Sequence, residues 1–168
     1  LNHAVLSASS AYRWLECPPS ALATADIPDE TTIYAQEGSA AHEMAEYKIR
    51  WHLGAKDLAP PNVGNFNAEE IDRYTDSYAY YATDKIETIR KICPDAIVMV
   101  EQRLDFSNYV KDGFGTGDLV IVADDVLQVI DFKYGKGVTV SAELNPQMML
   151  YALGALNLYG YLYDIKTV

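Results

Sequence analysis

The sequence predicts an α/β fold in which α-helices flank a central mixed β-sheet, and the spacing of its apolar residues is the main reason. Over 68–92 apolar side chains recur at three- and four-residue intervals, which is typical of a helix. From Ile97 to Lys133 the apolar period changes to two, which is typical of strands, and helical spacing returns after Asn145. Elements that each bury one face pack in layers, so we expect helices against a sheet of about four or five strands.

Two helical segments are expected before residue 68. A short helix or capped turn lies within 7–23, and a helix of about four turns follows Gly38 and ends at Gly54. The loop 58–67, rich in Pro, Gly and Asn, is too short to separate two domains. A single domain over residues 1–168 is therefore expected, in agreement with the usual size of one domain.

The clearest helix is expected over 68–92. Asn67 and Glu70 resemble a capping box at its start, and Pro94 ends it. One stripe of this helix is expected to face the core, and it consists of Ile71, Tyr74, Tyr78, Tyr81, Lys85, Ile89 and Ile92. Tyrosines of the stripe could instead stack on nucleobases, but their regular spacing favours packing.

Strands are expected in five segments of the second half of the chain. These are 97–105, 117–123, 126–133, the short 138–140 after a glycine-rich loop at 134–137, and an edge strand at 161–168. Asn145 as N-cap and Pro146 in the first turn begin a helix that runs to about Gly160. Because the edge strand stops without a natural ending, we expect the chain to be C-terminally incomplete.

The composition limits the class of protein. The net charge of −11 argues against a protein that coats nucleic acid through a basic face, although a divalent metal can join an acidic cleft to a phosphate. No apolar run is long enough to span a membrane, and the chain has no recognisable signal peptide, so a cytoplasmic location is expected. Cys17 and Cys93 lack metal-binding spacing, and both are expected to be reduced.

A predicted hairpin brings two acidic residues together. Counting back from a turn at 124–125 pairs Ala123 with Val126 and Asp118 with Asp131. Opposed side chains have Cβ atoms about 5 Å apart, so the two carboxylates repel unless a cation lies between them. Mg²⁺ or Mn²⁺ suits oxygen ligands, and the backbone carbonyl of Phe132 could complete part of the metal's shell.

Alternation places Lys133 on the same face as Asp131 and Asp118. A lysine beside a metal can orient an attacking water and offset charge on a phosphate in the transition state. Asp-x-Lys is also common on solvated strands, but the apolar residues at 119–122 and 129–130 favour a position at the ends of buried strands.

These residues carry a resemblance to a known family. The run GTGDLVIVADDVLQVIDFKYGKG, followed by NPQMMLY and preceded by GSAAH, resembles the RecB-like branch of the PD-(D/E)XK nucleases, above all uncharacterised phage-encoded members. The matching positions, in chain order, are Gly38, His42, Asp118, Asp131, Lys133, Gln147 and Tyr151. Four motifs in the expected order cover most of the chain, which is more specific than any single motif.

The resemblance implies a role for each matching residue and a restriction-endonuclease-like fold. It makes His42 a third metal ligand beside Asp118 and Asp131, and Lys133 the catalytic lysine. Gln147 and Tyr151 lie one helical turn apart and reach the site or the DNA backbone, and the helix N-terminus before Gln147 is a favourable place for phosphate.

The implied activity is Mg²⁺- or Mn²⁺-dependent hydrolysis of DNA, as an exonuclease in recombination or phage DNA metabolism. DNA, and a recombination or helicase protein, are the implied partners, inside a bacterial host cell. Some relatives hold an iron-sulfur cluster through one early and three late cysteines. Cys17 resembles the early one and the late three are missing, so we expect no iron-sulfur cluster in this chain.

Two rival functions stay open. A DNA-end or protein-binding module with weak or no turnover agrees with the acidic charge, and a metal-dependent hydrolase of small phosphate esters would act on nucleotides but not on polymer. Glu46 is more easily explained as a solvated helix charge than as a site residue. Glu101, on the first strand, lies either near the metal or at the sheet edge, and we do not count it among the ligands.

Overall fold

The computed structural model describes residues 4–24, 27, 32–135 and 140–168. Its helices and strands, in chain order, are η1 (Ala8–Ser10), α1 (Ala11–Glu16), α2 (Pro19–Ala23), α3 (Ile33–His52), α4 (Ala68–Ile92), β1 (Ile97–Asp105), β2 (Phe114–Ala123), β3 (Val126–Ile130) and α5 (Pro146–Tyr159). No helix in the described ranges is both long enough and apolar enough to cross a membrane.

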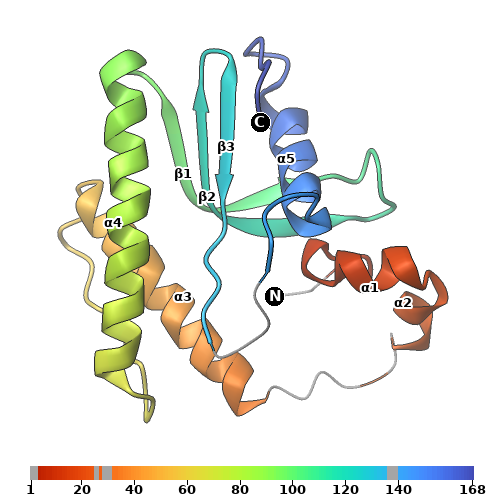
Figure 1. Cartoon of the computed structure of the whole chain (residues 1–168), viewed down its shortest axis with the longest axis horizontal. Coiled ribbons are helices and arrows are strands. Elements are labelled where there is room, and N and C mark those ends of the chain that lie inside the picture. Colours follow the sequence, from red (N-terminus) through yellow and green to blue (C-terminus); the bar gives the residue numbers. More distant parts are fainter. Residues whose placement is uncertain (1–3, 25–26, 28–31, 136–139) are drawn as a thin grey trace.

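The structure has three layers, with a small sheet between two layers of helices. The strands run antiparallel in the order β1-β2-β3, with β2 in the centre. Helices α3 and α4 cover one face of the sheet, and α5 with η1 and α1 covers the other (Figure 1). The predicted α/β class is confirmed, with helices flanking a sheet as expected.

The predicted mixed sheet of four or five strands is wrong for the part of the chain that the structure describes, where three antiparallel strands form. The expected strand at 138–140 falls largely on residues outside the described ranges. At 161–168 the expected edge strand is reduced to one parallel bridge between Thr167 and Val126. The backbone N–H of Leu127 donates to the carbonyl of Thr167, but the turn before this contact keeps the segment from running along β3.

The β2–β3 hairpin has the predicted register. Ala123 pairs with Val126, and the ladder continues to Leu119 with Ile130. Asp124, at the turn, has a positive φ of 46°, a conformation that Asp tolerates better than most residues. The third strand ends at Ile130, so it is shorter than the predicted 126–133.

Helix α3 begins earlier than predicted. Thr32 is its N-cap, and the Thr32 hydroxyl accepts a hydrogen bond from the backbone N–H of Ala35 at 3.1 Å. Gly38, which the sequence analysis placed before the helix, therefore lies inside its second turn. A Cβ at Gly38 would meet no atom within 4 Å, so no close contact explains the glycine.

The bounds of α4 agree with the prediction, and its buried face agrees in part, because Ile71 is buried and Tyr78 and Ile89 pack against the core. Asn67 caps the helix by accepting from the N–H of Glu70 at 3.2 Å. Tyr74, Tyr81 and Ile92, predicted to face the core, are 48%, 51% and 81% exposed. The fully buried positions of α4 are Ile71, Thr75, Ala82 and Ile86.

Small side chains explain why the buried face of α4 is rotated from the predicted stripe. The helix packs along α3, whose buried residues include Ala41 and Ala45. Thr75 and Ala82 let the two helices approach, whereas the large tyrosine rings fit only beside this contact or outside it. A prediction from the spacing of apolar residues alone therefore gives a stripe that only partly overlaps the buried face of α4.

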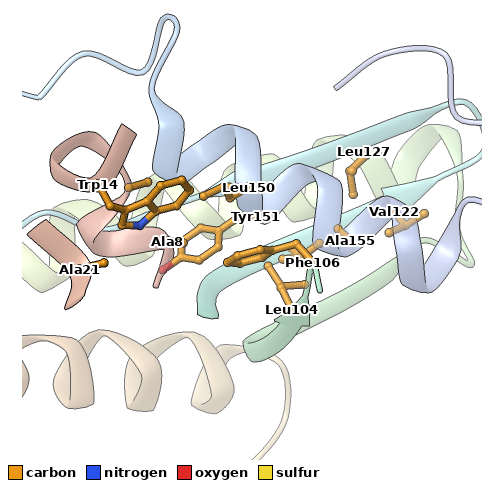
Figure 2. Close-up of a cluster of buried hydrophobic side chains, with 12 residues drawn as sticks. Ala8, Trp14, Ala21, Leu104, Phe106, Val122, Leu127, Leu150, Tyr151 and Ala155 are labelled. Atoms are coloured by element: carbon orange, nitrogen blue, oxygen red, sulfur yellow. The ribbon is translucent and has the colours of Figure 1, made fainter. Parts of the chain in front are cut away.

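The face of the sheet under α5 carries the larger core. Tyr151 of α5 lies with Trp14 and Phe106 in this cluster (Figure 2). Gly154 lets α5 lie directly on β1, because an added Cβ would come within 2.9 Å of the Leu104 Cβ. This packing holds the N-terminal turn of α5 over the end of β3.

Candidate functional site

A histidine on α3 meets an aspartate on the central strand. Nδ1 of His42 lies 3.3 Å from Oδ1 of Asp118. Asp118 is 9% exposed, and its Oδ2 accepts a hydrogen bond from the backbone N–H of Phe132 at 2.5 Å. Two predicted site residues that are 76 positions apart are thus in contact, and the segment after β3 is attached to the same carboxylate.

Glu101 of β1 is the third member of this group. One side-chain ligand atom from each of His42, Glu101 and Asp118 lies within 4.8 Å of the other two. We call these residues the His-carboxylate cluster. It holds one imidazole and two carboxylates, which together form a candidate site for a divalent metal ion.

The backbone of Glu101 is unusual. Its φ is 53°, in the left-handed region that a glutamate seldom adopts. Val100 belongs to the core on the α3 and α4 side of the sheet, whereas Leu104 belongs to the core under α5, so the strict alternation of faces along β1 is broken once between them. A strained non-glycine residue at a cluster of charged groups is a common mark of a functional site.

Glu101 was not predicted as a ligand from the sequence, yet a signal was present. Val100 pairs with Leu119 and Gln102 pairs with Gly117, so Glu101 stands opposite Asp118 in the register. A similar count along β1 and β2 finds it once the register of these two strands is known. The loop between β1 and β2 runs from Phe106 to Gly113, however, and a loop of that length does not define a register from sequence.

The charges of the cluster are strongly coupled. Burial and the negative charges of Asp118 and Glu46 raise the pKa of Glu101 to about 7. Burial alone would lower the pKa of His42, but its hydrogen bond to Asp118 and the nearby carboxylates outweigh burial and raise that pKa. The carboxylates that raise both pKa values would also attract a bound cation.

A second network surrounds Lys133. The ammonium nitrogen of Lys133 lies 2.7 Å from Oδ2 of Asp131 and donates to Oε1 of Gln147 at 3.0 Å. Nε2 of Gln147 donates to Oδ1 of Asp131 at 3.3 Å and to the hydroxyl of Tyr151 at 3.0 Å. We call these four residues the Lys133 network. It brings together the four motif residues that the resemblance assigned to the third strand and the last helix.

Burial shapes the ionisation of this network too. It raises the pKa of Asp131, and the hydrogen bond from Lys133 offsets part of that effect. The charge of Asp118 raises the pKa of Asp131 further. Burial raises the pKa of Tyr151 to about 12, which keeps its hydroxyl protonated near neutral pH.

The predicted pairing of Asp118 with Asp131 lies one step beyond the last ladder pair. Leu119 with Ile130 is the final pair, and beyond it Asp118 binds the N–H of Phe132 while Asp131 turns to Lys133. The two networks therefore meet at this point, where the charges of Asp118 and His42 act on Asp131.

Phe132 anchors the segment that follows β3. Its side chain is buried, stacks on Tyr78 with ring centres 4.7 Å apart, and meets His42 edge-on at 5.3 Å. The sequence analysis assigned its carbonyl to a metal, and that role stays a prediction. The observed contact of its backbone is the N–H donated to Asp118.

The start of α5 is less open to phosphate than the sequence analysis expected. The side chain of Asn145 accepts from the backbone N–H groups of Gln147 and Met148, so this cap already satisfies two of the free donors. What α5 contributes is the side chain of Gln147 rather than an empty helix N-terminus.

The residues of the His-carboxylate cluster fit a divalent cation. Asp118 is buried, Glu101 is destabilised as an anion, and the donors are one nitrogen and two oxygens. Mn²⁺ accepts imidazole nitrogen more readily than Mg²⁺, which prefers oxygen and water, so the donor set favours Mn²⁺ of the two predicted ions.

Fold and site together define an α/β protein with a His-carboxylate cluster beside a lysine network. A family model described as "Protein of unknown function (DUF2800)" matches residues 3–168, and the chain belongs to that family. No solved structure matches the chain.

Proposed function

We propose that this protein is a divalent-metal-dependent nuclease that hydrolyses phosphodiester bonds of DNA on a restriction-endonuclease-like fold. The observation that carries the proposal is the convergence of the motif residues. His42 and Tyr151, near the two ends of the motif set, belong to networks that meet where Asp118 stands opposite Asp131, one step beyond the last pair of the β2–β3 ladder. Random solvated charges would not be gathered from a helix, a central strand and a second helix.

His42, Glu101 and Asp118 would hold the metal, with Asp131 next to them. When bound, Mg²⁺ or Mn²⁺ supplies a water of lowered pKa and stabilises negative charge on the phosphate. Lys133 is half exposed at its side chain, so its ammonium group can reach a phosphate or an attacking water while Asp131 holds it. Gln147 positions that ammonium group by accepting from it, and Tyr151 in turn binds Gln147.

The net charge of −11 favours the small-ester hydrolase more than the nuclease, since a long polyanion is repelled by an acidic surface. This second candidate shares the same metal and lysine chemistry. It differs in substrate, because mononucleotides and other small phosphate esters would be hydrolysed and polymeric DNA would stay intact. The binding module without turnover differs from both in lacking hydrolysis.

Calorimetric titration with Mn²⁺, followed by degradation assays on supercoiled plasmid and on linear DNA, tests the proposal. We expect Mn²⁺ to bind, DNA to be degraded, and Lys133→Ala to abolish degradation while Mn²⁺ binding persists. Lys166→Ala is the matched control, because that lysine is exposed and pairs only loosely with Asp164 at 3.3 Å. Mn²⁺ binding without hydrolysis of any phosphate ester, polymeric or small, would refute the nuclease and favour the binding module.

Linear and circular substrates also separate the two kinds of nuclease. An exonuclease degrades linear DNA and leaves closed circles intact, and we propose this activity, in the cytoplasm and in recombination or phage DNA metabolism, on the family resemblance. Nicking or linearisation of the plasmid would show an endonuclease instead. Hydrolysis of mononucleotides alone would favour the small-ester hydrolase.

A further inference from the structure

A cavity of about 570 Å³ lies beside the Lys133 network. Its walls come from the first two turns of α3 and of α4 and from the segment after β3, which lie together at one end of the molecule (Figure 1). The lining residues are Tyr34, Glu37, Glu70, Tyr74, Lys133, Tyr134 and Gly135. We call it the tyrosine cavity.

Three aromatic rings line this cavity. Tyr74 and Tyr134 are nearly perpendicular, at 84°, with ring centres 5.8 Å apart, so they form a corner. Tyr74 is 48% exposed and Tyr34 is 81% exposed, although both rings have large apolar faces. The guanidinium of Arg73 lies 4.9 Å from the centre of the Tyr74 ring and covers part of it, which leaves the other ring surfaces for a planar ligand.

Two carboxylates show that the cavity is unsuited to phosphate. Glu37 and Glu70 stand among the rings, and after burial their charges are the main reason why the pKa of Tyr134 is raised. A phosphate placed here would be repelled by both. A nucleobase would not, because its N–H groups can donate to a carboxylate while its faces stack on tyrosine.

Lys133 connects the cavity to the proposed chemistry. Its ammonium group binds Asp131 and Gln147 in the Lys133 network, and the same residue lines the cavity. A nucleotide whose phosphate lies at Lys133 would therefore have its base directed either into the cavity or back into the solvent. The rings and carboxylates make the cavity the more favourable place for the base.

From this arrangement we propose that the tyrosine cavity binds one unpaired nucleobase next to the phosphate under attack, so that the substrate is single-stranded DNA or a frayed or single-stranded end. The inference rests on the proposed nuclease function, because it assumes that a DNA phosphate lies at Lys133. In a duplex each base is paired and stacked, and moving it into the cavity would first cost the energy of unpairing.

Binding of two fluorescent probes tests the cavity separately from hydrolysis. One probe is a short single-stranded oligodeoxynucleotide, and the other is a strand of the same length made only of abasic deoxyribose phosphates. Both are titrated by anisotropy with Ca²⁺ in place of Mn²⁺, and the strands are checked for integrity afterwards. Since the abasic strand keeps every phosphate, the difference between the probes reports the bases alone.

We expect the wild type to bind the intact strand about tenfold more tightly than the abasic one. Tyr74→Ala and Tyr34→Ala should each remove most of this difference in affinity without weakening the binding of the abasic strand. The corresponding phenylalanine variants should keep the difference. Tyr81→Ala is the control, because Tyr81 lies on the same helix with a similar exposure of 51% and outside the cavity lining. Melting curves of each variant check that it folds.

Three results would overturn the inference. They are equal affinity of the wild type for both probes, an equal loss of affinity for both probes in Tyr74→Ala, and no binding of either probe. The nuclease proposal fails by a different result, the absence of Mn²⁺-dependent hydrolysis. If DNA is degraded at the same rate by wild type and Tyr74→Ala, and equally in single- and double-stranded form, the nuclease proposal stands and the base-binding role of the cavity is refuted. A base-dependent affinity without hydrolysis would do the reverse.

Discussion

Replacing Glu101 by Gln separates the electrostatic cost of the His-carboxylate cluster from its use in holding a metal. The pKa of Glu101 is about 7 in the folded protein and 4.5 in its ordinary state. An acid whose pKa is raised by folding contributes stability below its unfolded pKa and loses that contribution as the pH rises through the folded value. Glu101 therefore destabilises the metal-free protein increasingly between about pH 4.5 and pH 7.

The size of this effect follows from the same pKa. A fully buried group would cost about 3 kcal/mol above pH 7, and because Glu101 is only half-buried we reduce the cost to about 1 kcal/mol. Glutamine keeps the length of the side chain without the charge. In urea unfolding without metal, Glu101→Gln is expected to be about 1 kcal/mol more stable than the wild type at about pH 8, and nearly equal to it at about pH 5.

Mn²⁺ should reverse this order. A metal at a hundredfold excess over its dissociation constant stabilises the folded wild type by about 2.7 kcal/mol, and the variant, which lacks one carboxylate ligand, should gain less than half of that. Glu43→Gln makes the same charge change at an exposed neighbour of His42 and should show neither effect. If Mn²⁺ stabilises Glu101→Gln as much as the wild type, Glu101 is no ligand and the cluster is not a metal site.

Three further predictions concern α5. Gln147→Ala should lower DNA hydrolysis at least tenfold with little change in melting temperature, because the bond to Asp131 positions the network rather than the core; an unchanged rate would refute this. Asn145→Ala removes the N-cap and should cost about 1 kcal/mol in urea unfolding, whereas Asn145→Ser should restore most of it. Gly154→Ala should destabilise by about 1 to 3 kcal/mol, because the new Cβ meets Leu104; a neutral result in unfolding experiments would show that α5 can shift away from β1.

Local signals in the sequence were sufficient for much of the fold. The Asn67 cap and Pro94 correctly delimit α4, and the aspartates at 124–125 correctly locate the hairpin turn. These features act within a few residues along the chain, so they can be recognised without knowing what packs against them. The predicted start of α3 was wrong because the first turn after the Thr32 cap is exposed, so no core-facing periodicity marks it.

The candidate site was predictable in part for the same reason. A tight turn sets the register of β2 with β3, so counting from it brings Asp118 near Asp131 and Lys133. Glu101 depends on the register of β1 with β2 across a long loop, and on a local break in the alternation of faces, so its place in the cluster was not evident.

By itself the sequence determined what short-range rules govern: both ends of α4, the start of α5, and the turn and register of the β2–β3 hairpin. Only the tertiary structure decided how α4 turns on α3, which carboxylate joins His42 and Asp118, and where the exposed tyrosines gather. The physical reason is that these features result from the packing of segments distant in sequence, where small side chains set the approach of helices and the approach decides which residues meet.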